Sequence, residues 1–224
     1  MKIFVLSVIT LCISISLFAQ PEFGILAGPQ MMSARYDVKG KKQETDFKYG
    51  FQFGGMMKVP FENKLYFAPA VFYSMKGYKV TFDQFVYPPD PAAIDNDVSL
   101  HNVEIAALLQ YDFSNNPGHF FIKFGPSIET QLFGKEKFNK ITGEQVSRNM
   151  KFSFADYGRF GANLLGHLGY ETASGFTIFA QYTFGVGSVS NTDGGPSIRH
   201  RAFGISIGKY FNRKKIVIDT RNKE

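Results

Sequence analysis

The residues best suited to chemistry are ionisable side chains on the polar faces of segments in which polar and apolar residues alternate. They are Lys58, Lys76, Glu104, Lys123, Glu129, Arg159 and His167. Successive side chains of an extended strand point to opposite faces, so these seven are expected to share one interior. Charges held away from bulk water are costly unless they are paired. The pattern therefore predicts a structural network of ion pairs, and a proton or solute pathway is the alternative.

The two acids of this set, Glu104 and Glu129, are expected to form ion pairs with particular cations. We expect Glu104 or Glu129 to lie close to Lys123 or Arg159, within the range of about 6 Å over which opposite charges hold each other's charged form. Such pairs would fill the interior and make it rigid.

Patterns typical of catalysis or metal binding are weak in this chain. The four histidines lie on different segments without the spacing of a zinc site. The glycines of residues 185–187 and 193–196 precede no helical pattern, so they indicate turns rather than phosphate loops. We therefore expect no enzyme activity, no cofactor and no metal site. His200, between Arg199 and Arg201, is expected to contact an outer-leaflet phosphate or to lie in solvent.

Eight segments between Phe23 and Phe211 show the two-residue period of β-strands. The connections between them are alternately short, at 61–64, 114–118 and 172–175, and long, at 35–46, 81–97, 134–151 and 189–198. An even number of strands with short turns at one end and long loops at the other is typical of outer-membrane barrels. The predicted fold is all-β: an eight-stranded antiparallel up-and-down transmembrane β-barrel with both chain ends in the periplasm.

The composition of the two faces favours a membrane protein. The apolar faces hold large side chains such as Phe51, Phe53 and Tyr73 and almost no charge, whereas the polar faces mix charged and amide side chains with many glycines. A barrel strand needs only about 9–11 tilted residues to cross a bilayer. The alternative is an exported soluble barrel of lipocalin type, whose apolar face would point inward around an apolar ligand.

The N-terminus has the layout of a secretory signal peptide. An apolar run of about 16 residues ends near Ala19, whereas a spanning anchor, the weaker alternative, needs roughly 20. We expect residues 1–19 to be removed, residues 20–211 to form the barrel domain and residues 212–224 to form a periplasmic C-terminal tail. The only cysteine, Cys12, lies in the signal, so the mature chain would have no thiol or disulfide chemistry. The net charge of +6 comes from scattered Lys and Arg, so no nucleic-acid partner is expected.

Several short stretches resemble one family of barrels. Asn102–Tyr111, Phe124-Gly125-Pro126, Asp156-Tyr157-Gly158 and Phe203–Gly208 are similar to the PorT-like outer-membrane β-barrel family of Bacteroidetes. Ala106 stands where family members commonly have proline. The resemblance covers nearly all of the mature chain and implies an eight-stranded outer-membrane barrel. The founding member is associated with the type IX secretion machinery, but no functional residue set carries over.

The sequence therefore predicts a structural or interaction protein of the bacterial outer membrane, surrounded by outer-membrane lipid. A protein partner would bind through loops 81–97 and 134–151 or through the C-terminal tail. Residues 87–91, Tyr-Pro-Pro-Asp-Pro, are expected to be stiff and extended. Four acidic residues lie in or beside that loop, so a calcium contact is an alternative, although the spacing of an EF-hand is absent. The alternative functions are an accessory component of a type IX-like secretion system, a narrow solute channel and the soluble carrier.

Overall fold

The computed structural model describes residues 21–211, so the expected signal peptide and C-terminal tail lie outside the described residues. All regular structure in this range belongs to one sheet of 13 strands. In chain order the strands are β1 (Glu22–Val38), β2 (Lys41–Lys42), β3 (Glu44–Asp46), β4 (Lys48–Glu62), β5 (Leu65–Phe67), β6 (Ala70–Thr81), β7 (Asp95–Ala106), β8 (Leu109–Asp112), β9 (His119–Asn139), β10 (Gln145–Asn149), β11 (Phe160–Glu171), β12 (Phe176–Gly185) and β13 (Ser197–Tyr210). Within residues 21–211, no helix is long and apolar enough to cross a membrane.

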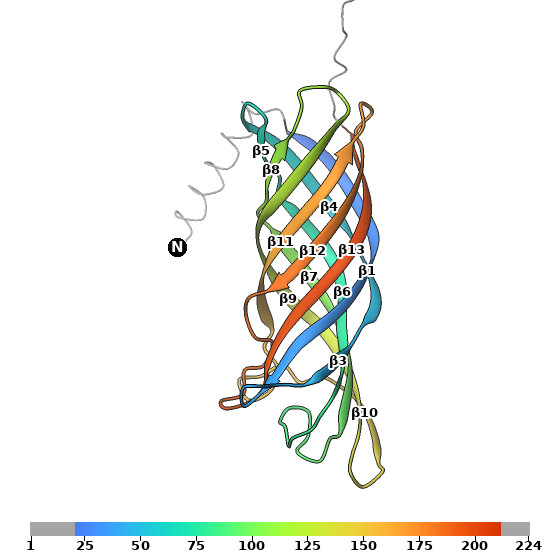
Figure 1. Ribbon diagram of the computed structural model, residues 1–224, viewed down its shortest axis with the longest axis vertical. Coiled ribbons are helices and arrows are strands. Elements are labelled where there is room, and N and C mark those ends of the chain that lie inside the picture. Colours follow the sequence, from blue (N-terminus) through green and yellow to red (C-terminus); the bar gives the residue numbers. More distant parts are fainter. Residues whose placement is uncertain (1–20, 212–224) are drawn as a thin grey trace, which may run out of the picture.

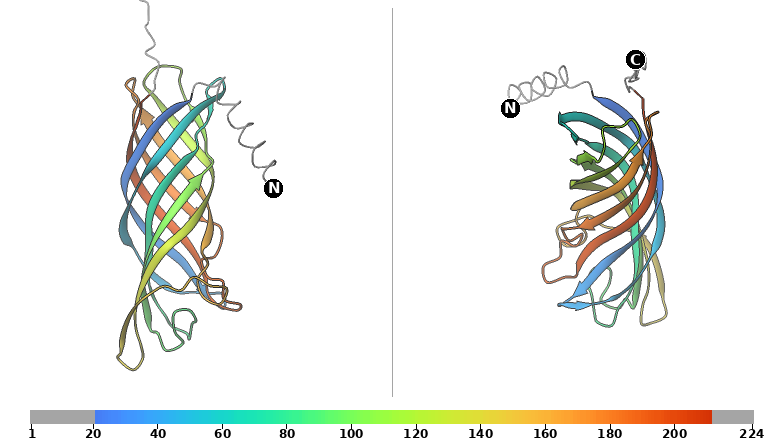
Figure 2. Two further views of the ribbon diagram at one scale, coloured as in Figure 1. Left: turned by 180° about the vertical axis from the view of Figure 1, so that it is seen from behind. Right: turned by 45° about the horizontal axis from the view of Figure 1, so that its top comes forward.

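The sheet closes into a barrel in which all neighbouring strands are antiparallel (Figures 1 and 2). The ring has eight positions, occupied by β1, β4, β5 with β6, β7 with β8, β9, β11, β12 and β13. β13 pairs with β12 on one side and with β1 on the other, which closes the ring. A closed ring leaves no strand edge with unpaired backbone groups, and such an edge would be too costly inside a bilayer. The predicted fold class is confirmed.

Two positions of the ring are each divided between two strands, β5 with β6 and β7 with β8, but the ring stays closed at these breaks. Between β5 and β6, Pro69 has no N–H to give to a ladder. Its carbonyl still accepts a hydrogen bond from the Met57 N–H at 2.9 Å, and the Ala68 N–H donates to the Leu108 carbonyl at 2.7 Å. Neighbouring strands therefore remain connected across the break.

All three short turns lie at the same end of the barrel. Asn63 takes a φ of 49° in the turn after β4, and Gly175 takes a φ of 83° in the turn before β12, a backbone region that favours these two residue types. At that end Gly24 of β1 pairs with Tyr210 of β13, so the described chain begins and ends beside the short turns (Figure 1). In outer-membrane barrels this is the periplasmic end.

The opposite end is more ordered than the sequence predicts. The predicted loop 134–151 is largely a hairpin of β9 and β10, and the predicted loop 35–46 contains the end of β1 together with β2 and β3. The loop interpretation failed because the outward face turns polar where the strands leave the membrane. Lys135 and Lys137 point outward there while Phe138 is buried, so strand alternation continues without its hydrophobic signal.

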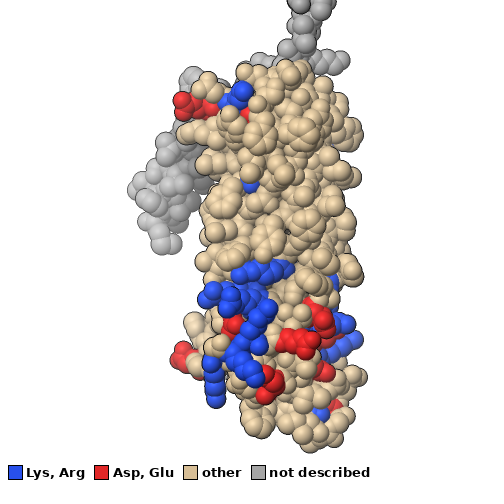
Figure 3. All heavy atoms as spheres, in the orientation of Figure 1, with Lys and Arg blue, Asp and Glu red and all other residues tan. Residues whose placement is uncertain are grey.

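Large apolar side chains cover the outside of the barrel. On β13 Phe203, Ile205 and Ile207 are about half exposed, while the residues between them face inward. Figure 3 shows a broad belt with very little charge between the two ends of the barrel. A soluble lipocalin-like barrel would need the reverse arrangement, so the geometry opposes that alternative.

The interior holds two apolar clusters. The periplasmic cluster lies nearer the short turns and includes Leu26, Met56, Phe72, Leu108, Phe121, Leu165 and Phe179. The outer cluster lies beyond the membrane belt and includes Tyr36, Tyr78, Val86, Leu100, Met150, Tyr157, Val189 and Ile198. Polar side chains lie between these clusters and at the periplasmic end.

Candidate functional site

Six of the seven predicted interior residues point into the lumen and are buried: Lys58, Lys76, Glu104, Lys123, Glu129 and His167. Arg159 is a correction. It precedes β11, is exposed, and its guanidinium lies 5.2 Å from the centre of the Phe152 ring. The prediction extended the strand period backward into residues 154–159, which instead form an external loop.

A triad of one cation and two acids occupies the middle of the lumen. Lys76 Nζ donates to Glu104 Oε2 at 2.9 Å and to Glu129 Oε2 at 2.5 Å, and all three side chains are 1% exposed. The second oxygen of Glu104 accepts hydrogen bonds from Ser127 Oγ at 2.5 Å and Asn163 Nδ2 at 3.1 Å. These donors stabilise a group with two carboxylates and only one ammonium, because polar partners offset the cost of burying charge.

The expected partners of these acids are wrong, although the expected ion-pair network is present. Lys123 and Glu129 lie six residues apart on β9, which is about 20 Å along an extended strand. Glu104 pairs in register with Glu129, so it is equally distant from Lys123. The ammonium that the acids use belongs to Lys76.

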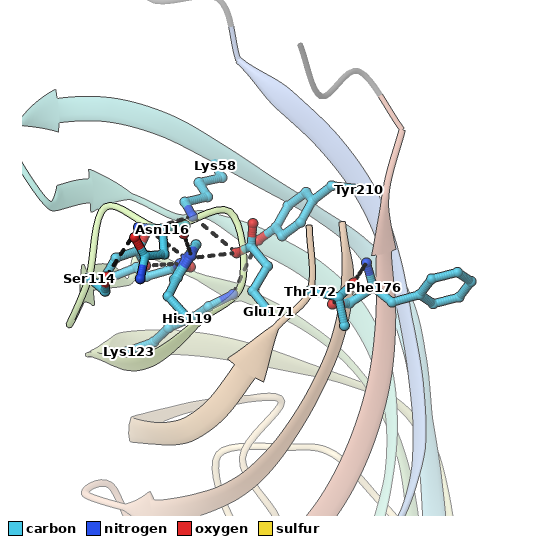
Figure 4. Close-up of polar contacts among 11 residues, drawn as sticks. Lys58, Ser114, Asn116, His119, Lys123, Glu171, Thr172, Phe176 and Tyr210 are labelled. Carbon is cyan, nitrogen blue, oxygen red and sulfur yellow. Dashed lines mark hydrogen bonds and ion pairs between the residues drawn. The ribbon is translucent and has the colours of Figure 1, made fainter. Parts of the chain in front are cut away.

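A second ionic cluster fills the periplasmic end of the lumen (Figure 4). Lys58 Nζ donates to Asp112 Oδ2 at 2.7 Å and to Glu171 Oε2 at 3.0 Å, and His119 Nε2 lies 3.0 Å from Asp112 Oδ2. Asp112, Glu171 and His119 were not predicted as site residues. Asp112 lies an even number of residues after Glu104, and Glu171 lies an even number after His167. Strand alternation therefore places both acids on the lumen face, and this signal in the sequence could have identified them.

Lys123 and His167 lie next to each other between this cluster and the triad. They form a register pair on β9 and β11. Lys123 Nζ donates to the Tyr210 hydroxyl at 3.2 Å and lies 4.9 Å from the centre of the Phe121 ring. The His167 ring stacks on Phe179 with 5.0 Å between the ring centres. Aromatic faces thus surround both groups.

His200 corrects the expectation of a phosphate contact or a solvated end. Its ring is 2% exposed inside the barrel and meets Tyr78 edge-on at 6.1 Å. Strand alternation explains the difference, because turning the imidazole inward points the flanking Arg199 and Arg201 outward.

Three outer loops close the mouth of the barrel. Val86, Tyr157 and Val189 come from different loops and are buried together in the outer cluster. The Tyr157 hydroxyl donates to Glu136 Oε2 at 2.8 Å, and burial raises the pKa of this phenol well above its usual value. Arg148 links the hairpin to the mouth by donating to Glu136 Oε1 and the Pro89 carbonyl, both at 2.7 Å.

Loop 81–97 folds back over the mouth instead of extending away from it. The Tyr36 hydroxyl donates to the Pro88 carbonyl at 3.2 Å, which holds the proline-rich stretch against β1. Its acids have separate partners: Asp83 pairs with Lys41, and Asp97 pairs with Lys48. Within residues 21–211, no group of three His, Cys, Asp or Glu side chains is placed to hold a metal ion.

Loops 81–97 and 134–151 meet at the outer tip. The Ile94 N–H donates to the Asn139 carbonyl and the Ile141 N–H donates to the Ala92 carbonyl, both at 2.9 Å. A pocket of about 470 Å³ opens between them, lined in part by Phe85, Ile94 and Ile141. We call these three side chains the tip patch.

The closed ring, the apolar exterior and the polar interior define a transmembrane β-barrel. Residues 18–191 match the model of a family described as outer membrane protein beta-barrel domain. The chain belongs to this family, and it is a protein of the bacterial outer membrane. No curated protein matches it.

Several solved structures are similar to this chain at low sequence identity. Ail of Yersinia pestis is 17% identical, with 85% of this chain and 99% of that chain covered and a TM-score of 0.43. OprG of Pseudomonas aeruginosa is 15% identical, with coverage of 86% and 96% and a TM-score of 0.49. Neisserial surface protein A is 14% identical, with coverage of 84% and 97% and a TM-score of 0.42.

Proposed function

We propose that this chain is a non-enzymatic outer-membrane protein that binds a protein partner through the tip patch. The observation that carries the proposal is apolar surface far from the lipid belt. Phe85, Ile94 and Ile141 are 75%, 43% and 65% exposed at the extracellular tip. Contiguous apolar surface in water commonly marks an interaction site.

The backbone around the tip patch supports binding without rearrangement. The two loops that carry it are joined by main-chain hydrogen bonds and by a bridge between Ala93 and Lys140. A surface that is already ordered loses little conformational entropy when a partner binds. Loops 81–97 and 134–151 both contribute side chains to the tip patch, which supports a partner that contacts both loops.

The lumen favours a structural role over solute conduction. Lys76, Glu104 and Glu129 are almost fully buried in its centre, and apolar clusters lie on both sides of them. An eight-stranded barrel is just wide enough for its side chains to fill. The ionic groups therefore act as a rigid support for the extracellular loops.

The experiment is site-specific photo-crosslinking in intact cells. A photoreactive residue at Phe85 or Ile141 is expected to give the same adduct, and one at the exposed Asp193 of another outer loop is expected to give none. The substitution F85S should reduce the adduct formed from position 141. Equal adducts at all three positions, or none at 85 and 141, would contradict the proposal.

A narrower second candidate rests on the sequence motifs alone. This candidate is an accessory role in type IX-like protein secretion, with a partner at the tip or at the C-terminal tail, and it follows from the resemblance to the PorT-like family. Deletion of the gene should then reduce the amount of exported protein in the medium while other outer-membrane barrels stay at normal levels. An unchanged set of exported proteins would rule this role out.

A further inference from the structure

Three arginines cluster on the outward face where β1 and β13 leave the membrane belt. Arg35 and Arg199 pair directly across these strands, and Arg201 follows on β13. Like charges placed opposite each other on neighbouring strands destabilise a sheet. Arg201 is the next residue after Arg199 on the outward face of β13, so all three side chains lie on one side of the sheet. The arrangement therefore favours an external anion at this point.

The carboxylates nearby do not neutralise this cluster. Arg35 Nε bonds Asp37 Oδ2 at 2.9 Å. In the part of the chain that the structure describes, no carboxylate forms an ion pair with Arg199, Arg201 or Lys42. With Lys42 the group contains four cations and one acid, so its net charge is +3. Elsewhere on the outer surface Lys48 and Lys79 both pair with Asp97.

An open pocket of about 650 Å³ adjoins these cations, and we call it the belt pocket. It lies between two paired stretches of β1, because β4 pairs with β1 only as far as Met32 and Lys48 and β2 pairs with it from Asp37 and Lys42. Between them, β3 pairs with β6 instead of β1. Its lining combines the cations Arg35, Lys42 and Arg201 with the apolar Met31, Phe47 and Phe203. Thr45 also lines it, so alternation along β3 points Glu44 and Asp46 away.

The belt pocket lies at the boundary between hydrocarbon and headgroups. Phe203 ends the outward apolar row of β13, and Arg201 is two residues further out, about 7 Å along the strand. Figure 3 shows Lys and Arg gathered directly below the uncharged belt on this face. Arg201 is held in place there, since its guanidinium lies 3.6 Å from the Phe184 ring centre and Nη1 donates to the Gly185 carbonyl at 3.1 Å.

We propose that the belt pocket binds a phosphate-bearing lipid of the outer leaflet. The phosphate lies among the guanidinium groups, which suit oxyanions because they donate two hydrogen bonds in one plane. The acyl chains lie on Met31, Phe47 and Phe203. The outward-facing Tyr182 and Phe203 line the pocket at the edge of the apolar belt, where lipid rather than soluble anion is the abundant neighbour. This proposal is independent of the tip patch.

The test compares two lipids that differ only in phosphate. The purified full-length mature protein in phosphatidylcholine nanodiscs is given diphosphoryl lipid A or the same lipid without phosphates, and bound lipid is counted by native mass spectrometry. The variant R35Q/R199Q/R201Q loses the cluster. The variant K39Q/K135Q/K137Q removes the same charge from exposed positions outside the belt pocket and is the control. A heat-dependent gel shift verifies that each variant forms a closed barrel.

Wild type and the control variant should retain the phosphorylated lipid at least about tenfold better than the dephosphorylated one, because hydrogen bonds between guanidinium groups and phosphate are charge-assisted and strong. The arginine variant should lose this preference. Equal retention of both lipids by wild type would overturn the proposal, as would equal losses in the two variants. Displacement of the lipid by an equal concentration of inorganic phosphate would also overturn it, since the ligand would then be a free anion.

Discussion

Glu104 and Glu129 lie directly opposite each other on β7 and β9 and share the ammonium of Lys76. Two acids facing each other inside a barrel would repel strongly without a cation between them. Lys76 reaches them from β6, so three different barrel strands meet in one ionic group. This contact fixes the relative position of the strands at the centre of the lumen.

Replacing Lys76 with methionine should destabilise the barrel severely. It leaves two carboxylates buried without their cation, and breaking a buried ion pair costs about 3–5 kcal/mol. The free energy of unfolding in urea, measured with the protein in lipid vesicles, tests this. The control K137M removes an exposed lysine and should change stability by less than about 0.5 kcal/mol. Equal stability of the two variants would contradict the structural role of the triad.

Neutralising the acids should rescue the Lys76 substitution. In K76M/E104Q/E129Q no unpaired charge remains, and uncharged replacements of buried ion pairs are often tolerated. The triple variant should recover more than half of the stability lost in K76M by the same urea measurement. No recovery would mean that the size of the side chains, rather than charge, decides stability here.

The eight strands could be predicted because their hydrophobic alternation is strong inside the membrane belt. The ion-pair partners could not, because they depend on the register and tilt of the closed sheet. In the register of β6 and β7, Lys76 lies opposite Leu100, four positions from Glu104. The side chains of Lys76 and Glu104 nevertheless meet inside the lumen. Arg159 shows the converse error, since the two-residue period is already present in the sequence before β11 begins at Phe160.

Glycine is required where the lumen side of one strand touches the backbone of the next. A Cβ at Gly54 would lie 2.3 Å from the Val71 carbonyl oxygen and 2.4 Å from the Phe72 Cα, whereas one at Gly166 would meet nothing within 4 Å. Overpacking of this kind costs about 1–3 kcal/mol. G54A should therefore lower the yield of heat-modifiable barrel, while G166A should not. Equal yields would show that the strands can separate at Gly54.

The lumen should not conduct solutes. Liposomes that contain the protein should not swell in isotonic arabinose, because the apolar clusters and the triad block the path at three levels. Removing residues 84–91 opens only the outer level, so that variant should also remain closed. Swelling at the rate of a general porin by either protein would contradict the sealed lumen.

Tyr157 should resist ionisation at alkaline pH. Burial raises the pKa of this phenol in the folded protein, so its contribution to stability is present below its unfolded pKa of about 10 and is lost as the pH rises above that value. Absorbance titration near pH 11 should show fewer tyrosines ionising in folded than in unfolded wild type, and Y157F should reduce that difference by one tyrosine. Folded Y157F that ionises one tyrosine fewer than folded wild type near pH 11 would instead show that Tyr157 is accessible.

The most direct test of the account is the side of the membrane on which each end of the barrel lies. The mature chain expected here has no cysteine, so I141C at the tip patch and N115C in a short turn can be labelled individually. A membrane-impermeant maleimide should label I141C in intact cells and N115C only after the outer membrane is opened. Labelling of N115C in intact cells, with I141C protected, would contradict both the orientation and an extracellular role for the tip patch.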